Sequence, residues 1–258
     1  MRALVTGAAR RLGREMALYL ARRGHDVAVH YAGSAREAAE VVAEIQAMGR
    51  KAAALRADLL REDETETLVS RAAAALGGPL DVLVNNASVF EHDTLQTATR
   101  ESWDRHMESN LRAPFVLMQH FARQAPPPVA DAAGEPVAQA LVVNMIDQRI
   151  RKPTPEFASY TIAKMGLWAL TQTGAQALAP AVRVNAIGPG PTLQGGRQDP
   201  AAFARQRSAT LLRRGANPAD ITAALGYLVD AASVTGQIIM VDGGQHLAWE
   251  TPDVLGVE

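Results

Sequence analysis

The 258-residue sequence contains no cysteine. This excludes disulfide bonds, catalytic thiolates and cysteine-ligated iron–sulfur clusters, and it fits a reducing compartment. An excess of one charge is also lacking, because 26 lysines and arginines stand against 27 aspartates and glutamates. A near-neutral chain gives no reason to expect nucleic acid or an anionic membrane as a partner. No stretch approaches 18 uncharged apolar residues, so no membrane span is predicted, and we expect a cytoplasmic protein.

Apolar residues make up 48% of the sequence and occur in short runs that alternate with longer, alanine-rich segments. The short runs are almost wholly apolar, which is typical of parallel strands covered on both faces. Strands are expected at 3–6, 27–31, 52–56, 82–84, 140–145, 182–187 and 237–241. Helices are expected at 12–23, 35–48, 63–76, 101–123, 160–178 and 218–229. The alternation predicts an α/β fold in one domain, 1–258, with a doubly wound parallel sheet and helices on both faces.

Two segments do not fit this alternation. Residues 124–137 are rich in proline and alanine, and we interpret them as an exposed loop insertion without a function of its own. Residues 188–215 begin with a glycine- and proline-rich stretch and continue into a polar helix expected at 201–212. This second segment follows the carboxyl end of a strand, where open α/β sheets bind ligands, so we expect a mobile loop over the substrate.

A glycine-containing turn follows the first expected strand and opens the first expected helix. Its sequence is Thr6-Gly7-Ala8-Ala9-Arg10-Arg11-Leu12-Gly13. In this position, backbone N–H groups and the helix N-terminus can bind a pyrophosphate. The spacing differs from the usual G-x-G-x-x-G, because Arg11 takes the place of a middle glycine. The turn predicts a dinucleotide-binding site.

The second expected strand ends in His30-Tyr31-Ala32-Gly33-Ser34, without the carboxylate that NAD-binding sites usually place there. Arg10 in the glycine turn, with Ser34 and Arg36 at the next helix, instead offers partners for a 2′-phosphate. These residues predict NADP(H) as the dinucleotide.

Tyr160 and Lys164 are four residues apart, so they lie on one face of an expected helix. A phenol with a pKa near 10 is a poor acid or base at neutral pH. A nearby ammonium favours the phenolate, and we therefore expect Lys164 to lower the pKa of Tyr160 toward the working range.

These motifs, with Asn85-Asn86-Ala87, Asn110, Pro189-Gly190 and Asp242-Gly243-Gly244, resemble the short-chain dehydrogenase/reductase family over residues 3–244. The resemblance implies a single-domain Rossmann fold with a seven-stranded sheet, assembled as a homotetramer through its long helices. It also implies that Tyr160 is the acid/base, that Lys164 holds the cofactor ribose, and that Asn110 anchors a water.

The resemblance further implies a set of binding residues. Asn86 and Ala87 would line the adenosine ribose, Asp58 and Leu59 would contact adenine, and Pro189-Gly190 would lie by the nicotinamide. The cofactor contacts expected in full are Gly7, Arg10, Arg11, Leu12, Gly13, His30, Tyr31, Ser34, Asp58, Leu59, Asn86, Ala87, Ser88, Tyr160, Lys164, Pro189 and Gly190. The expected substrate contacts are Arg11, Ser88, Phe90, Asp147 and Tyr160.

One departure from the family narrows the substrate. Asp147 stands thirteen residues before Tyr160, where most relatives have a serine that binds a carbonyl. Burial beside a tyrosine and a dinucleotide would raise the pKa of this carboxyl, so it could donate a proton or face adjacent N–H groups of a ring. With Phe90 available for stacking, the set is similar to the pteridine reductase branch, which includes dihydromonapterin and dihydrofolate reductases of this fold. That branch implies hydride transfer from NADPH to a C=N bond of a pterin.

Two alternatives stay open. The first is a short-chain reductase of a carbonyl or alcohol (a sugar, an acyl thioester or a steroid-like compound), with Asp147 in the role of the serine. The second is a dinucleotide-sensing protein that does not catalyse a reaction, although an intact set of Tyr160, Lys164 and Asn110 argues against it. The six histidines show no metal-ligand spacing, so no metal site is predicted.

Overall fold

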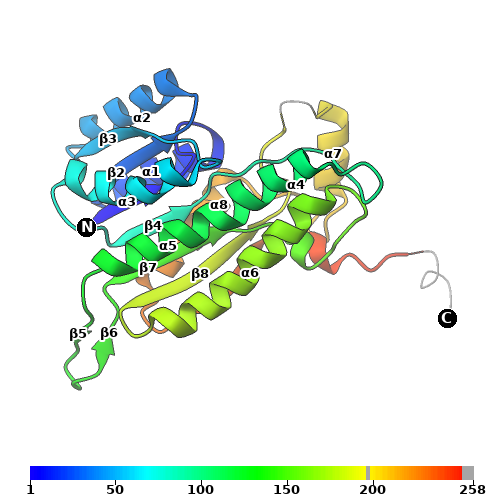
Figure 1. Ribbon diagram of the computed structural model, residues 1–258. Helices are drawn as coiled ribbons and strands as arrows, with labels where there is room; N and C mark the ends of the chain where they lie inside the picture. Colours follow the sequence, from blue (N-terminus) through cyan, green and yellow to red (C-terminus); the bar gives the residue numbers. More distant parts are fainter. Residues whose placement is uncertain (196–197, 252–258) are drawn as a thin grey trace.

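The computed structural model describes residues 1–195 and 198–251. Within these residues the chain forms a seven-stranded parallel sheet in the order β3-β2-β1-β4-β7-β8-β9 (Figure 1). The predicted α/β fold with a doubly wound parallel sheet is confirmed. The strands are β1 (Arg2–Val5), β2 (Asp26–Tyr31), β3 (Ala52–Arg56), β4 (Val82–Asn85), β7 (Ala140–Met145), β8 (Val182–Pro189) and β9 (Ile238–Val241).

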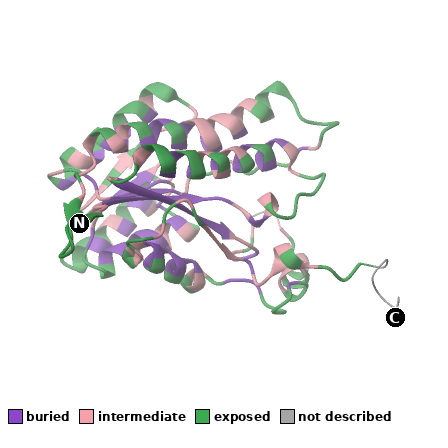
Figure 2. Ribbon diagram, turned by 90° about the horizontal axis from the view of Figure 1, so that it is seen from below, coloured by how far each residue is buried: buried purple, intermediate pink, exposed green. Residues whose placement is uncertain are grey.

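Helices cover both faces of the sheet. The longer helices are α1 (Arg11–Arg22), α2 (Ala35–Ala47), α3 (Glu62–Leu76), α5 (Ala113–Gln124), α6 (Ala158–Leu178) and α8 (Pro218–Asp230). Buried side chains of α1, α2 and α8 form one apolar core with the sheet, and those of α3, α5 and α6 form a second. In Figure 2 the buried sheet lies between these two helical layers. Short apolar runs become strands because both of their faces are buried in this way.

The helix expected at 101–123 is divided in the structure. It consists of α4 (Arg100–Met107), a π-helical turn (Glu108–Arg112) and α5. In a regular α-helix the residue at 114 would donate to the carbonyl of Asn110, but Pro114 has no N–H group. The π-helical turn lies just before this proline, and π turns inside helices frequently occur at functional sites.

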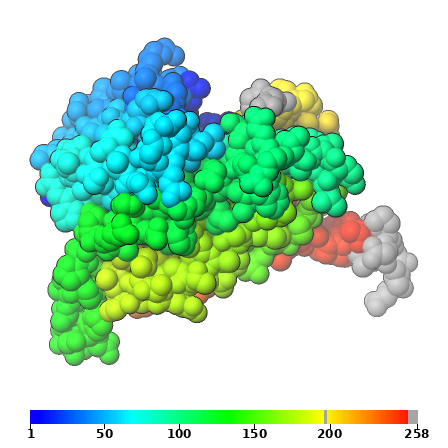
Figure 3. Space-filling view, in the orientation of Figure 1, coloured from blue at the N-terminus to red at the C-terminus, as the bar shows by residue number. Residues whose placement is uncertain are grey.

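The two unusual segments differ from the expectation in detail. Residues 124–137 contain a small antiparallel hairpin, β5 (Val129–Ala130) and β6 (Pro136–Val137), which projects from the body of the molecule (Figures 1 and 3). The hairpin forms because Asp131 accepts the backbone N–H groups of the turn. Beyond β8, the predicted polar helix is shorter, α7 (Pro200–Ser208). Residues 196–197 of the expected substrate loop and 252–258 of the expected domain lie outside the described residues.

Over the part of the chain that the structure describes, none of the helices is both long enough and apolar enough to cross a membrane.

Within β8, one charged side chain is buried. Arg183 is 8% exposed and donates to the carbonyl oxygens of Leu228 (2.7 Å), Val229 (3.1 Å) and Ala231 (2.9 Å) at the end of α8. The last carbonyls of a helix have no partner within the helix, so the guanidinium satisfies them and favourably meets the negative end of the helix dipole.

We predict that Arg183→Met destabilises the fold by about 3 kcal/mol, because it leaves several buried carbonyl groups without donors. Urea unfolding monitored by circular dichroism measures this loss. The matched control is Arg36→Met, because the Arg36 side chain is 82% exposed and the same replacement there should leave the unfolding midpoint nearly unchanged. An equal effect of the two substitutions would contradict the role assigned to Arg183.

Candidate active site

The glycine turn is built by close contacts that only glycine allows. Gly7 adopts a left-handed conformation with φ +61°. A Cβ atom on Gly13 would lie 2.2 Å from the carbonyl oxygen of Gly7, so any larger residue would push α1 away from the turn. In the described structure, the start of α1 has neither a side-chain cap nor an acidic residue in its first turn. Its first N–H groups are therefore available to an anionic ligand.

Residues after β4 hold the turn in place. The hydroxyl of Thr6 accepts the backbone N–H groups of Asn86 (2.8 Å) and Ala87 (2.9 Å). The side-chain amide of Asn86 donates in return to the carbonyl of Thr6 at 2.8 Å. Asn86 and Ala87, expected at the adenosine ribose, thus position the glycine turn, and both line the cavity described below.

His30 supports the same turn from β2. Its Nδ1 accepts the N–H of Gly7 at 2.9 Å, and its Nε2 lies 3.0 Å from the carbonyl of Ala57. Since Nδ1 accepts, the proton is on Nε2, and the ring is neutral. Burial lowers the pKa of His30 to about 4. His30 lines the cavity, as expected, but its two ring nitrogens are both used within the protein.

Arg10 has a partner that the sequence analysis missed. Its guanidinium forms an ion pair with Glu37, in the first turn of α2. The backbone N–H of Glu37 and then the Arg10 side chain keep the pKa of this carboxyl below its usual range. Within the described structure, the cavity lining includes Arg10 and Ala32 but not Tyr31 or Ser34. An acidic residue early in the second helix was the available signal for this pair.

Three of the four expected catalytic residues lie together where β7 ends and α6 begins. Tyr160, which is 5% exposed, donates its hydroxyl to Oδ2 of Asp147 at 2.9 Å. The other oxygen of Asp147 accepts the backbone N–H of Arg149 at 2.9 Å. Lys164 is 2% exposed, and its Nζ donates to the carbonyl of Met145 at 2.8 Å. The helical spacing therefore places Tyr160 and Lys164 together, and Asp147 contacts the tyrosine directly.

The pKa shifts of this group agree with the expectation for Asp147 and differ from it for Tyr160. Burial raises the pKa of Asp147, as predicted, although the N–H of Arg149 opposes the shift. Burial and the neighbouring Asp147 also raise the pKa of Tyr160 well above 10. The prediction that Lys164 lowers the tyrosine pKa is therefore wrong for this state, because Lys164 binds a carbonyl while Asp147 stands at the hydroxyl. Burial lowers the pKa of Lys164 to about 8.

Asn110 lies in the π-helical turn and is fully buried. Its side-chain oxygen accepts the N–H of Val89 at 2.9 Å, and its side-chain nitrogen donates to the carbonyl of the same residue at 2.8 Å. Asn110 thereby fixes the segment that carries Ser88 and Phe90. Its expected role in anchoring a water stays a prediction.

An aromatic cluster borders the catalytic group. Phe90 is 51% exposed, and its ring stacks on Phe157 with centroids 4.3 Å apart and planes 8° from parallel. It also meets the edge of Tyr160 at 4.7 Å. Phe157, which the sequence analysis missed, adopts φ +59° at the start of α6. One face of Phe90 is therefore occupied within the protein, and only the remainder is available to a ligand.

A cavity of about 830 Å³ joins these groups. It lies at the carboxyl ends of β1, β4, β7 and β8, where the glycine turn, the loops and the catalytic residues converge. Its lining includes most of the predicted cofactor and substrate residues, namely Gly7, Arg10, Arg11, Leu12, Gly13, His30, Asp58, Leu59, Asn86, Ala87, Ser88, Phe90, Asp147, Tyr160, Lys164, Pro189 and Gly190.

Arg11 links the glycine turn to the expected substrate loop. Its guanidinium donates to the carbonyls of Leu193 (3.0 Å) and Gln194 (2.7 Å). Gln148 and Gln245 are among the lining residues that were not predicted. Their side-chain oxygens are buried and have no hydrogen-bond partner within residues 1–195 and 198–251. Unpartnered buried acceptors are costly, so these two oxygens mark polar groups for which the described protein supplies no donor.

Comparison with known proteins agrees with this geometry. A family model for enoyl-(acyl carrier protein) reductases matches residues 7–246. The chain is 34% identical, over 94% of both chains, to a short-chain dehydrogenase/reductase of Armillaria gallica.

The chain belongs to the short-chain dehydrogenase/reductase family.

Two further members of this family resemble the chain closely. The 3-oxoacyl-[acyl-carrier-protein] reductase FabG of Staphylococcus aureus is 32% identical over 95% of this chain and 98% of its own length. The FolM alternative dihydrofolate reductase 1 of Brucella canis, solved in complex with NADP, is 42% identical. It superposes with a TM-score of 0.89 over 98% of this chain and 96% of its own. Membership in the family makes this chain an oxidoreductase.

The buried imidazole of His30 generates a prediction about pH. Its pKa is lowered from 6.5 to about 4, so above pH 6.5 the ring is neutral in both the folded and the unfolded chain. Below pH 6.5 the unfolded chain takes up a proton that the folded chain excludes, and stability falls as the pH falls toward 4. Between pH 7 and pH 5 this one residue should remove about 2 kcal/mol.

Urea unfolding at the two pH values tests this expectation. His30→Gln keeps an acceptor and a donor but does not titrate, so its stability should fall less between pH 7 and pH 5 than that of the wild type. His120→Gln, at a partly exposed position of α5, serves as the control and should follow the wild type. Parallel curves for wild type and His30→Gln would show that His30 is not the group responsible.

Proposed function

We propose that the protein is an NADPH-dependent reductase of pterins. It would reduce a C=N bond of an oxidised pterin, a dihydropterin or dihydrofolate. The observation that carries the proposal is the hydrogen bond from Tyr160 to Asp147, which places a carboxyl of raised pKa where a serine is expected in a carbonyl reductase. The likeness to the Brucella dihydrofolate reductase supports it.

The cavity fits NADPH on several counts. The uncapped start of α1 offers N–H groups to the pyrophosphate, and the glycine turn leaves room for its close approach. Arg10 would bind the 2′-phosphate in exchange for Glu37, and Lys164 would hold the nicotinamide ribose. The unpartnered oxygen of Gln245 suits an amide N–H. When bound, the cofactor supplies the hydride, and the Brucella relative was solved with NADP.

Asp147 and Tyr160 hold the proton that completes the reduction. Addition of a hydride to the carbon of a C=N bond leaves a pair of electrons on nitrogen, which must receive a proton. Burial raises the pKa of Asp147 and so favours its protonated form, and the tyrosine hydroxyl bonded to it can pass a proton on. The remaining oxygen positions of Asp147 also match the adjacent N–H groups of an aminopyrimidine ring.

The aromatic cluster favours a flat substrate. Phe90 and Phe157 stack in parallel, and Tyr160 meets Phe90 edge-on, so the three rings form an aromatic wall beside the catalytic group. A planar heterocycle gains contact area and favourable stacking on such a wall. The unpartnered oxygen of Gln148, next to Asp147, adds an acceptor for a ring amino group.

Reduction of a carbonyl group is the second candidate. It is supported by the 32% identity to the 3-oxoacyl-[acyl-carrier-protein] reductase of Staphylococcus aureus, and by Tyr160, which would protonate the developing alkoxide. In this reading Asp147 performs the task of the serine.

For either substrate we propose a homotetramer, since Phe115, Ile162 and Met165 expose apolar side chains on α5 and α6.

The two candidates are separated by NADPH consumption with a panel of pterins, dihydrofolate, simple ketones and 3-oxoacyl thioesters. We expect pterin reduction to exceed carbonyl reduction in the wild type. Asp147→Ser should lower kcat on the pterin about 100-fold while leaving or improving turnover of ketones, because serine binds a carbonyl but cannot supply the carboxyl. Tyr160→Phe should abolish both activities. Undiminished pterin turnover in Asp147→Ser would overturn the proposed substrate but not the reductase activity.

Cofactor selectivity gives a separate prediction. Arg10→Ala should raise the Kd for NADPH about tenfold and leave the Kd for NADH unchanged, because only NADPH carries the 2′-phosphate. Glu37→Gln should lower the Kd for NADPH, since the carboxylate no longer competes for Arg10. Isothermal titration calorimetry measures both constants. Equal changes for the two nucleotides in Arg10→Ala would place the 2′-phosphate elsewhere.

A further inference from the structure

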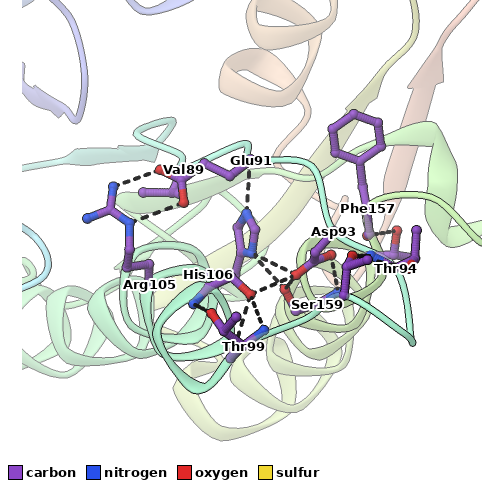
Figure 4. A network of polar contacts seen from close by, with 12 residues as sticks. Val89, Glu91, Asp93, Thr94, Thr99, Arg105, His106, Phe157 and Ser159 are labelled. Atoms are coloured by element: carbon purple, nitrogen blue, oxygen red, sulfur yellow. Dashed lines mark hydrogen bonds and ion pairs between the residues drawn. The ribbon is translucent and has the colours of Figure 1, made fainter.

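Asp93, His106 and Ser159 form a buried polar cluster beside the catalytic group. The three residues are 2%, 0% and 1% exposed, respectively. They come from the loop after β4, from α4 and from the first turn of α6, and their hydrogen bonds are drawn in Figure 4. None of them lines the cavity within the described structure. The proton transfer proposed for Asp147 and Tyr160 does not involve them.

The Asp93 cluster is linked by a series of hydrogen bonds in which each group donates to the next, from the backbone N–H of Glu91 to the carboxylate of Asp93. The backbone N–H of Glu91 donates to Nε2 of His106 at 3.1 Å, so this nitrogen is an acceptor. The proton of the neutral ring is then on Nδ1, which donates to the hydroxyl of Ser159 at 2.7 Å. The Ser159 hydroxyl in turn donates to Oδ2 of Asp93. Burial lowers the pKa of His106, consistent with the neutral ring.

This order differs from that of a hydrolytic triad. A serine nucleophile donates to the histidine and must reach its substrate, whereas Ser159 donates to the aspartate and is buried. Burial alone would raise the pKa of Asp93, but hydrogen bonds from Ser159 and Ser102 lower it, so the carboxylate stays charged. The cluster therefore has a fixed pattern of donors and acceptors and no accessible reactive atom.

Asp93 caps the helix that carries the catalytic tyrosine. Its carbonyl accepts the N–H groups of Phe157 (2.7 Å) and Ala158 (3.3 Å), and its Oδ1 accepts the N–H of Ser159 (3.2 Å). Phenylalanine at the N-cap has no side-chain acceptor, so a residue 66 positions before Ser159 supplies the cap. A carboxylate at this end of α6 is also favoured by the helix dipole.

The cluster connects the segment that carries Tyr160 with the segment that carries Phe90. Tyr160 directly follows Ser159, and Phe157 packs on Phe90. At the other end, Glu91 directly follows Phe90, and its N–H binds His106. The carboxylate of Glu91 is also held by Arg105 through two hydrogen bonds of 2.8 and 3.1 Å. A shift anywhere in this chain of bonds would move both the aromatic wall and the tyrosine.

We propose that Asp93, His106 and Ser159 are positioning residues that fix the hydroxyl of Tyr160 against Asp147 and the ring of Phe90 against Phe157. They act through the first turn of α6 and through the loop after β4, and they do not touch the reacting atoms. The proposal rests on the proposed acid/base role of Tyr160 but not on the identity of the substrate.

Asp93→Asn is the decisive substitution, because it keeps the shape of the side chain but reverses its hydrogen bonding. If the new amide nitrogen faces Ser159, the serine must donate to His106, and the ring proton must move to Nε2, where it meets the N–H of Glu91. We expect kcat to fall about 10- to 100-fold, since a displacement of 1 Å at a catalytic group can cost about that much. The Kd for NADPH, measured by calorimetry, should stay within about twofold of the wild type.

Two further variants keep the result interpretable. Ser159→Ala removes the hydroxyl but leaves the three N–H bonds to Asp93, so kcat should fall less than in Asp93→Asn. Asp131→Asn is the matched control, because Asp131 also accepts two backbone N–H groups but lies in the β5–β6 hairpin. It should leave kcat unchanged. In a crystal structure of Asp93→Asn, the Tyr160 hydroxyl should no longer lie within hydrogen-bond distance of Asp147.

Wild-type kcat in folded Asp93→Asn would overturn the proposal. Loss of kcat together with equal loss of NADPH binding would also overturn it, because that result indicates general damage to the fold. If the pterin is not the substrate, the same ratios are measured on whichever carbonyl compound the wild type reduces. If no compound of the panel is reduced, the position of the Tyr160 hydroxyl in the crystal structure decides.

Discussion

The hydrogen bond between Tyr160 and Asp147 is the interaction on which the arrangement of the cavity depends. The two side chains come from different elements, since Asp147 follows β7 and Tyr160 lies in the first turn of α6. A buried hydroxyl needs a partner, and here the partner is a carboxyl whose pKa burial has raised. The contact joins the carboxyl end of β7 to the start of the next long helix, at the end of the strands where open α/β sheets bind their ligands.

Much of this arrangement could be predicted from the sequence. The strands are predictable because central parallel strands are continuous apolar runs, and the proximity of Tyr160 and Lys164 is predictable because four residues make about one helical turn. Asp147 could be recognised as a departure at a fixed distance from the tyrosine. Ion pairs and hydrogen bonds between residues far apart in the sequence could not be predicted. Glu37 and Asp93 look like ordinary solvated acids until the fold places them beside Arg10 and Ser159.

The sign of the tyrosine pKa shift shows why spacing alone was insufficient. A lysine four residues away predicts stabilisation of the phenolate, and this holds only if the ammonium faces the hydroxyl. In the structure the ammonium binds the carbonyl of Met145 instead, and the ionisable group that the hydroxyl contacts is Asp147. Burial acts on both groups, raising the pKa of Tyr160 and lowering that of Lys164. Helical periodicity places residues on one face, but only the tertiary contacts determine which charge dominates.

Two buried imidazoles, His30 and His106, each hold a loop in place through one backbone N–H group. His30 accepts an N–H from the glycine turn, and His106 accepts an N–H from the loop that carries Phe90. Each ring uses its second nitrogen to bind an oxygen of another element, so each fixes a loop without adding a charge. A lysine or arginine in these positions could donate but not accept, and an aspartate would bring a negative charge toward the phosphates of a dinucleotide. Neutral histidine therefore meets both requirements, since it accepts the backbone N–H of a loop and adds no charge to the electrostatic field of the cavity. Among the described lining residues, the cations that set this field are Arg10, Arg11, Arg105, Arg149 and Lys164.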